Sequence, residues 1–166
     1  MIKTADKICP ESVEMRKAFC ESLIELAGED ENVIVMDGDL MGAMGTKPFA
    51  DEYPDQTLDC GIQEANAVGV AAGISAVGKI PFVHSFGPFI SRRACDQVFM
   101  SGAYARLNVK LVGSDPGITA QINGGTHMPF EDMALYRALP KSYVFDITDA
   151  AMLESVLEQC KDIHGV

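Results

Sequence analysis

The chain has 166 residues, of which 48% are hydrophobic and 22% are charged, a size and composition typical of one soluble globular domain. Its formal net charge of −11 argues against nucleic acids and anionic membranes as partners. The longest apolar stretch, residues 67–77, contains Gly and Ser and is too short to cross a bilayer.

Helices and strands are expected to alternate along the chain. Helices are expected where apolar residues recur at helical spacing, and strands where short apolar runs are bounded by turn residues. In chain order these are a helix over 11–27, a strand over 32–37, a glycine-punctuated loop over 38–45, a weak strand over 56–59, a helix over 63–77, a strand over 80–84, a helix over 89–104, a strand over 109–113, an irregular loop over 114–129, a helix over 130–138, a strand over 142–145 and a helix over 149–160.

This alternation predicts an α/β fold of three layers (α/β/α), in which helices cover both faces of a mostly parallel sheet. Ligands bind such sheets beyond the carboxyl ends of the strands, where loops 37–45, 60–64, 84–89 and 114–129 are expected. The last of these loops is long, and long loops are often functional. Residues 163–166 resemble the approach to one more strand, so the single domain over 1–166 is expected to lack its last strand.

Cysteine usage indicates a reducing compartment. The odd number of cysteines, without a C-x-x-C pair or metal-finger spacing, is typical of reduced thiols in a cytoplasm. The N-terminus has no hydrophobic signal stretch, so a cytoplasmic location is expected. The cysteines are Cys9, Cys20, Cys60, Cys95 and Cys160.

Glu64 is the most informative residue of the sequence. It follows a turn at Gly61 and opens a helix rich in Ala and Gly. A carboxyl group there is expected to be largely desolvated, which holds it protonated or ties it to a partner. Such an acid could give a proton to a ring nitrogen. The simpler interpretation is that an acidic residue suits the helix dipole.

Three further clusters follow expected strands. Phe86 and Phe89 could sandwich a planar heterocycle, or they could be core residues. His127 lies in a glycine-rich segment and could be an acid, a base or a hydrogen-bond donor, or a surface histidine without a role. Asp37 and Asp39 could bind a metal, but no further ligand is spaced to complete the site, so no metal site is predicted.

Taken in order, these segments resemble the pyrimidine-binding domain of the transketolase family. The resemblance covers about residues 16–154, with many motifs in register. The spacing of the two phenylalanines before Arg93 is more similar to transketolases than to deoxyxylulose phosphate synthases. The motifs are Arg16-Lys17, Asp39-Leu40, Asp59-x-Gly61-Ile62-x-Glu64, Ala71-Ala72-Gly73, Ser85-Phe86-x-x-Phe89, Arg93-Ala94-x-Asp96-Gln97, Gly117-Ile118, Gly124-x-Thr126-His127 and Leu139-Pro140.

The resemblance implies the thiamin diphosphate-binding fold and thiamin diphosphate as the cofactor. Glu64 would hydrogen-bond N1′ of the aminopyrimidine and so help the cofactor's imino nitrogen to remove the thiazolium C2 proton. A two-carbon ketol unit would then pass from a ketose to an aldose. Phe86 and Phe89 would pack on the pyrimidine, and Asp39 and Ile62 would complete the cofactor site.

Residues of other motifs would face the sugar substrate. His127, which would also be catalytic, and Asn123 would lie towards the hydroxyl groups of the sugar, and Arg16 and Asp115 towards the outer end of its channel. Transketolases commonly carry an acid at the position of Asn123, and a phosphate-facing His at the position of Asp115. A phosphate-facing Ser is matched by Ala43. These departures predict that the usual pentose phosphates are poor substrates, and that a non-phosphorylated or modified sugar is preferred.

The resemblance also implies that half of the catalyst is missing. Transketolases hold the diphosphate and its Mg²⁺ through a second module with a G-D-G motif followed by Asn, which this chain lacks. The third, C-terminal domain of the family is also absent. The chain therefore resembles the C-terminal section of a split transketolase. It is expected to be active only with an N-terminal-section subunit, and to self-associate.

Two alternatives keep the same fold. One is another thiamin diphosphate enzyme, similar to a deoxyxylulose phosphate synthase or to the beta subunit of a 2-oxo-acid dehydrogenase. The other is a non-catalytic module, although a scaffold would need neither Glu64, the two phenylalanines nor His127.

Overall fold

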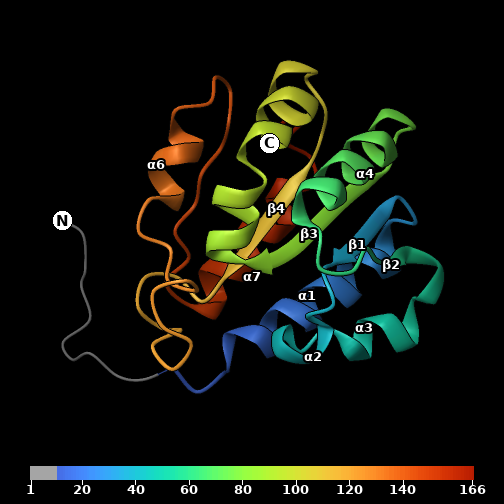
Figure 1. Ribbon diagram of the computed structural model, residues 1–166. Coiled ribbons are helices and arrows are strands. Elements are labelled where there is room, and N and C mark those ends of the chain that lie inside the picture. Colours follow the sequence, from blue (N-terminus) through green and yellow to red (C-terminus); the bar gives the residue numbers. More distant parts are fainter. Residues whose placement is uncertain (1–10) are drawn as a thin grey trace, which may run out of the picture.

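The computed structural model describes residues 11–166, so the predictions for Cys9 and the N-terminal segment lie outside the described residues. Four strands form one fully parallel sheet in the order β2-β1-β3-β4 (Figure 1). Leu58, Met36, Val83 and Leu111 lie in one row across it. The strands are β1 (Val33–Asp37), β2 (Thr57–Asp59), β3 (Ile80–Phe86) and β4 (Lys110–Ser114).

Most helices match the expected pattern, with boundaries shifted by a few residues, but the helix over Lys47–Glu52 was not predicted. The first and last begin at capping carboxylates: Glu14 accepts a hydrogen bond from Lys17 N, and Asp149 accepts one from Met152 N. Among residues 11–166, no helix has both the length and the apolar composition that a membrane span requires. The α-helices are α1 (Met15–Glu29), α2 (Met41–Met44), α3 (Lys47–Glu52), α4 (Glu64–Ala76), α5 (Cys95–Gln97), α6 (Asp132–Arg137) and α7 (Ala150–Cys160), with a 3-10 turn η1 (Pro54–Gln56).

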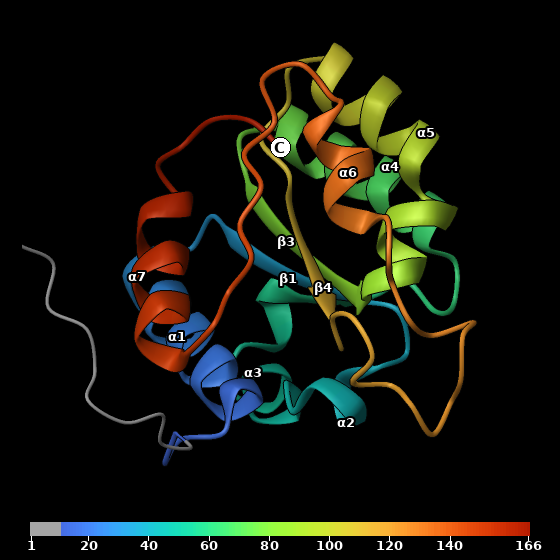
Figure 2. The ribbon, with the colours of Figure 1, turned by 90° about the vertical axis from the view of Figure 1, so that its left-hand side faces the viewer.

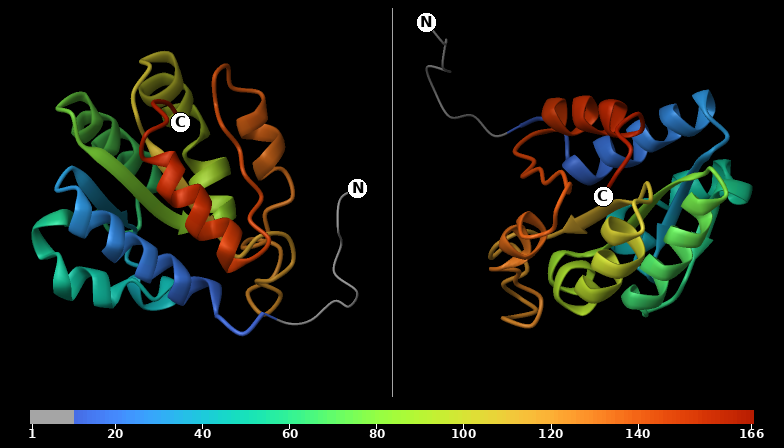
Figure 3. Two further views of the ribbon diagram at one scale, coloured as in Figure 1. Left: turned by 180° about the vertical axis from the view of Figure 1, so that it is seen from behind. Right: turned by 90° about the horizontal axis from the view of Figure 1, so that it is seen from above.

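The two faces of the sheet are covered by different helices (Figures 2 and 3). α1 and α7 pack on one face, where Phe19 and Leu157 join Phe82 in one buried cluster. On the other face, Val68 of α4 joins Val83 and residues of 89–104 in a second cluster. Phe82 and Val83 are neighbours in β3 that point to opposite faces, which explains the continuous apolar run. The predicted three-layer fold is confirmed.

The segment 89–104 is helical as predicted, but it is not one α-helix. Two π-helical stretches, η2 (Phe89–Arg93) and η3 (Val98–Tyr104), flank the short α5. The spacing of apolar residues does not distinguish these wider turns from α-helical ones. The predicted loop over 38–45 likewise contains the short helix α2.

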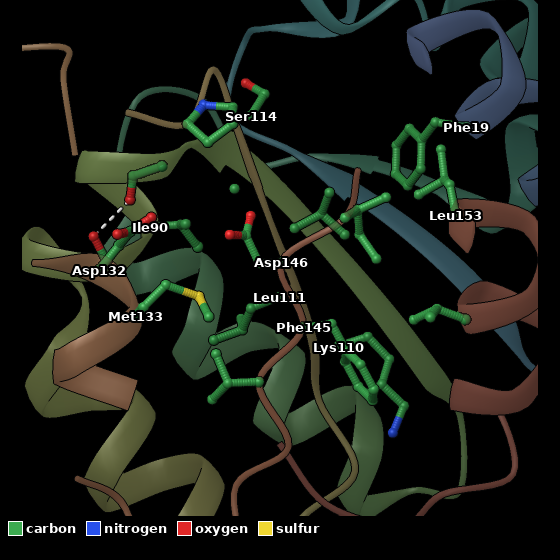
Figure 4. A pocket seen from close by; sticks show the side chains of 18 of the residues that line it. Phe19, Ile90, Lys110, Leu111, Ser114, Asp132, Met133, Phe145, Asp146 and Leu153 are labelled. Carbon is green, nitrogen blue, oxygen red and sulfur yellow. Dashed lines mark hydrogen bonds between the residues drawn. The ribbon is translucent and has the colours of Figure 1, made fainter. Parts of the chain in front are cut away.

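The predicted strand over 142–145 is wrong. Residues 142–148 are extended but pair with no strand, and a cavity of about 620 Å³ lies between them and β4 (Figure 4). The last residues of the chain reach into one end of this space: Val109 N donates to Gly165 O at 3.1 Å, and Tyr143 N donates to Val166 O at 2.8 Å. An apolar run forms a strand only where a neighbouring backbone lies within hydrogen-bonding distance.

Candidate active site

The loops that follow β1, β3 and β4 meet at the carboxyl edge of the sheet. β1 ends at Asp37, β3 at Phe86 and β4 at Ser114, and α4 begins at Glu64 directly after the β2 loop. Because all four strands are parallel, these ends lie on one edge, as the sequence predicts.

Glu64 is buried and has two partners. Only 2% of its surface is exposed. Ser85 Oγ donates to its Oε1 at 3.2 Å, and Arg93 Nη1 donates to its Oε2 at 2.8 Å. Of the two predicted states, protonated or tied to a partner, the structure shows the second. The Arg93 side chain is 48% exposed, so it can move into solvent while Glu64 stays in place.

Three aromatic rings cluster beside this carboxylate. The Phe86 and Phe89 rings meet edge to face at 6.0 Å, and the His127 ring lies 5.5 Å from Phe86 and 5.0 Å from Phe89. The Arg93 guanidinium lies 4.2 Å from the centre of the Phe89 ring, a cation–π contact. Both phenylalanines lie where β3 passes into η2, are only partly buried and belong to neither of the two buried clusters.

The long loop after β4 holds His127 at this cluster. Its turn places Gly124 at φ +80°, a conformation that favours glycine, and His127 N donates to Gly124 O at 3.0 Å. Thr126 Oγ1 lies 2.9 Å from His127 Nδ1. Arg92 binds the Thr126 carbonyl at 3.4 Å and pairs with Glu131 at 2.9 Å, which fastens the loop to η2.

Asp39 and Ile62 lie on two loops that share one carboxylate. Asp59 Oδ1 accepts hydrogen bonds from Asp39 N at 2.9 Å and from Gly61 N at 2.8 Å. Asp39 is held at φ 62°, and the side chain of Ile62 is exposed. Asp59 therefore joins the loop of Asp39 to the loop of Ile62. In the sequence it is noticeable only as part of a motif.

Arg16 and Asp115 form an ion pair at 3.1 Å between the start of α1 and the end of β4. The pair lies on the protein surface, with Arg16 the more exposed partner. Asn123 lies in the long loop, and its side chain makes no hydrogen bond within residues 11–166. The structure thus brings Glu64, Phe86, Phe89 and His127 into one cluster and pairs Arg16 with Asp115, while the side chain of Asn123 hydrogen-bonds to none of these residues.

A buried polar network at the same edge was not predicted from the sequence. His84 Nδ1 lies 3.0 Å from Asp37 Oδ2, and His84 Nε2 lies 3.2 Å from Ser114 Oγ. A histidine inside the apolar run of β3 was the available signal, because a buried polar side chain requires partners. In the described part of the chain, no group of three or more His, Cys, Asp or Glu side chains could hold a metal ion.

Comparisons with family models, known sequences and solved structures all point to the same family. Residues 11–162 match the model of the transketolase pyrimidine binding domain. A 6-deoxy-6-sulfo-D-fructose transketolase subunit of Clostridium sp. (strain MSTE9) is 50% identical over 145 residues, which is 87% of this chain and 45% of that protein. One of the subunits of an apulose-4-phosphate transketolase from Phocaeicola vulgatus is 33% identical over 150 residues, 90% of this chain and 48% of that protein.

The solved structure of a split gene transketolase, an inactive beta4 tetramer, superposes with a TM-score of 0.80 and 37% identity. The superposition covers 91% of this chain and 48% of that one, so this chain spans about half the length of these relatives. The chain belongs to the transketolase family, and residues 11–162 form its pyrimidine-binding domain.

Proposed function

We propose that the chain is the pyrimidine-binding subunit of a split, thiamin diphosphate-dependent transketolase, which moves a two-carbon ketol unit from a ketose to an aldose. The observation that carries the proposal is one buried carboxylate, Glu64, beside the rings of Phe86 and Phe89 at the carboxyl edge of the sheet. The named transketolase relatives favour this function over other thiamin enzymes and over a non-catalytic module.

These side chains fit the pyrimidine half of the cofactor. Phe86 and Phe89 offer apolar ring edges for a flat heterocycle, and Glu64 offers the acid that a ring nitrogen needs. Asp39 and Ile62 lie on loops at the same edge of the sheet, and the Asp59 carboxylate links these loops by accepting from Asp39 N and Gly61 N. When bound, thiamin diphosphate supplies a thiazolium carbon that takes up the electron pair of the broken carbon–carbon bond.

The protein contributes position, proton control and exclusion of water. Arg93 pairs with Glu64 at 2.8 Å and is half exposed, so it could leave when a ring binds, and the carboxyl group would then be free to hydrogen-bond N1′. The two phenylalanines would keep water from that hydrogen bond. His127, in contact with both rings, exchanges a proton or hydrogen bond with a substrate hydroxyl. Asn123 lies on the same loop, and in this proposal its side chain would face the sugar.

A partner subunit completes the site in this proposal. An N-terminal-section transketolase subunit would hold the diphosphate and Mg²⁺. Large apolar side chains are exposed around the site, as expected for a protein–protein interface: Ile62, Ile118, Ile122 and Phe130. The tetrameric state of the solved relative supports self-association as well. The free thiols Cys20, Cys60, Cys95 and Cys160 support the cytoplasm as the compartment.

The isolated chain is expected to bind thiamin diphosphate weakly or not at all. It offers contacts to the ring half only, so we expect a dissociation constant of about 1 mM or weaker in a calorimetric titration. The control is the same titration with the N-terminal-section subunit and Mg²⁺ present, where binding tightens. A dissociation constant of about 1 μM for the chain alone would refute the shared site.

The Arg16–Asp115 pair supports a donor sugar whose terminal group carries at most one negative charge. Asp115 already neutralises Arg16 and would repel a second anion. The neutral pair offers an anion little net attraction, and each unit of charge that lies nearer to Asp115 than to Arg16 is repelled. A phosphate dianion is therefore disfavoured more strongly than a sulfonate monoanion. The relative named for 6-deoxy-6-sulfo-D-fructose makes a 6-sulfonated ketose the donor that we propose.

A further inference from the structure

A network of buried side chains joins the carboxyl ends of three strands. Asp37 ends β1, His84 lies near the end of β3 and Ser114 ends β4. Asp37 and His84 are 1% and 2% exposed, and the links Asp37–His84 and His84–Ser114 measure 3.0 Å and 3.2 Å. The second carboxylate oxygen of Asp37 accepts the backbone N–H of Leu40.

The sheet does not need this network for its own pairing. Backbone ladders already join β1 to β3 and β3 to β4 in continuous parallel register. A buried carboxylate and imidazole carry a desolvation penalty that apolar side chains of similar size would avoid. We therefore look for the role of these polar side chains in the loops that they contact.

Each end of the network contacts a residue whose neighbour in the sequence has a positive φ angle. Leu40, bound by Asp37, follows Asp39 at φ 62°. Ser114, bound by His84, precedes Asp115 at φ 55°. Aspartate adopts such left-handed conformations more readily than most residues but less readily than glycine, so contacts of the neighbouring residues help to fix them. Asp39 has a second restraint from Asp59, whereas Asp115 has only its exposed ion pair with Arg16 as a further side-chain restraint within residues 11–166.

We propose that His84 is a positioning residue, which anchors on Asp37 and through Ser114 holds Asp115 in the left-handed conformation that pairs it with Arg16. His84 would thereby set the charge at the outer end of the substrate channel without touching the substrate. The inference rests on the proposed function for its effect on substrate selection, but the backbone effect at Asp115 is independent of any activity.

Two variants cut the same link in different ways. Ser114→Ala removes the hydroxyl, and His84→Asn keeps a donor for Asp37 but is too short to reach Ser114. Ser114→Thr keeps the hydroxyl and is the rescue variant. Ser75→Ala is the matched control. It also removes a serine hydroxyl with a hydrogen bond, since Ser75 Oγ accepts from Asn108 N at 2.8 Å, but it lies away from the site.

The first measurement is NMR of the full chain, in which a strong HN–Hα cross-peak within one residue reports a positive φ. We expect Ser114→Ala and His84→Asn to weaken this signal at Asp115, while Asp39 keeps it. The rescue and control variants should resemble the unmodified chain at both residues. An unchanged signal at Asp115 in both link-cutting variants would overturn the proposal, as would an equal loss at Asp39 and Asp115.

The second measurement is steady-state kinetics of the complex reconstituted with the N-terminal-section subunit. Ser114→Ala and His84→Asn should change KM for a 6-sulfonated ketose about threefold to tenfold, the effect of one lost hydrogen bond, with kcat nearly unchanged. A fall in kcat with KM unchanged would contradict a positioning role. If the unmodified complex transfers no ketol unit, the proposed function fails, and the NMR result still decides the role of His84.

Discussion

Replacing Glu64 with glutamine is expected to slow ketol transfer by the reconstituted complex about 10²–10⁴-fold. Glutamine has nearly the same shape and can still accept the hydrogen bond from Ser85, but it has no carboxyl proton to hold towards a ring nitrogen. It also releases Arg93, which is half exposed and finds solvent, so the fold is expected to survive.

The matched control for this prediction is Glu29→Gln, which removes another carboxylate that pairs with a cation, Lys161 at 3.3 Å, away from the site. Both variants should assemble with the partner subunit in analytical ultracentrifugation, and only Glu64→Gln should lose activity. Full activity of the Glu64→Gln complex would show that the buried acid is structural and would favour a non-catalytic module.

Replacing Asp115 with asparagine is expected to lower KM for a phosphorylated ketose by about tenfold or more. The change frees the Arg16 guanidinium and removes a repelling charge, and at a partly screened site one charge of this kind is worth at least ~1.4 kcal/mol, or tenfold. Asparagine tolerates positive φ about as well as aspartate, so the loop should keep its shape. Initial rates with xylulose 5-phosphate and with a 6-sulfonated ketose measure the effect.

The sulfonated donor, with one charge instead of two, should gain less from this change. Adding Arg16→Gln to Asp115→Asn should reverse the gain with the phosphorylated donor, because the freed cation is then lost. If the Asp115→Asn complex shows unchanged KM for both donors, the ion pair has no part in substrate selection.

The parts of the fold that depend on short-range patterns were predictable from the sequence. Continuous apolar runs indicated β1, β3 and β4, because a strand covered on both faces needs no polar alternation. Glu64 could be placed at the start of a helix, and its burial could be expected from the Ala- and Gly-rich helix behind it. Phe86 and Phe89 were identified by their spacing at a strand-to-loop transition.

What remained out of reach depends on contacts between distant segments. Arg16 and Asp115 are 99 residues apart; the family resemblance placed both at the outer end of the substrate channel, but it did not predict that they form an ion pair. Arg93 binds Glu64 and covers Phe89 together, a double role that requires the turn geometry of η2. The extended run over 142–148 has the composition of a strand, but its pairing depends on a neighbour that the pattern cannot supply.

The central claim is that Glu64 activates a cofactor that the chain holds only together with a partner subunit. The most direct test is the rate at which the C2 proton of thiamin diphosphate exchanges with deuterium, followed by NMR in three samples. These are the complex with the N-terminal-section subunit, the same complex carrying Glu64→Gln, and the chain alone. We predict fast exchange in the first sample and exchange near the rate of free cofactor in the other two. Equally fast exchange in the Glu64→Gln complex would contradict the account.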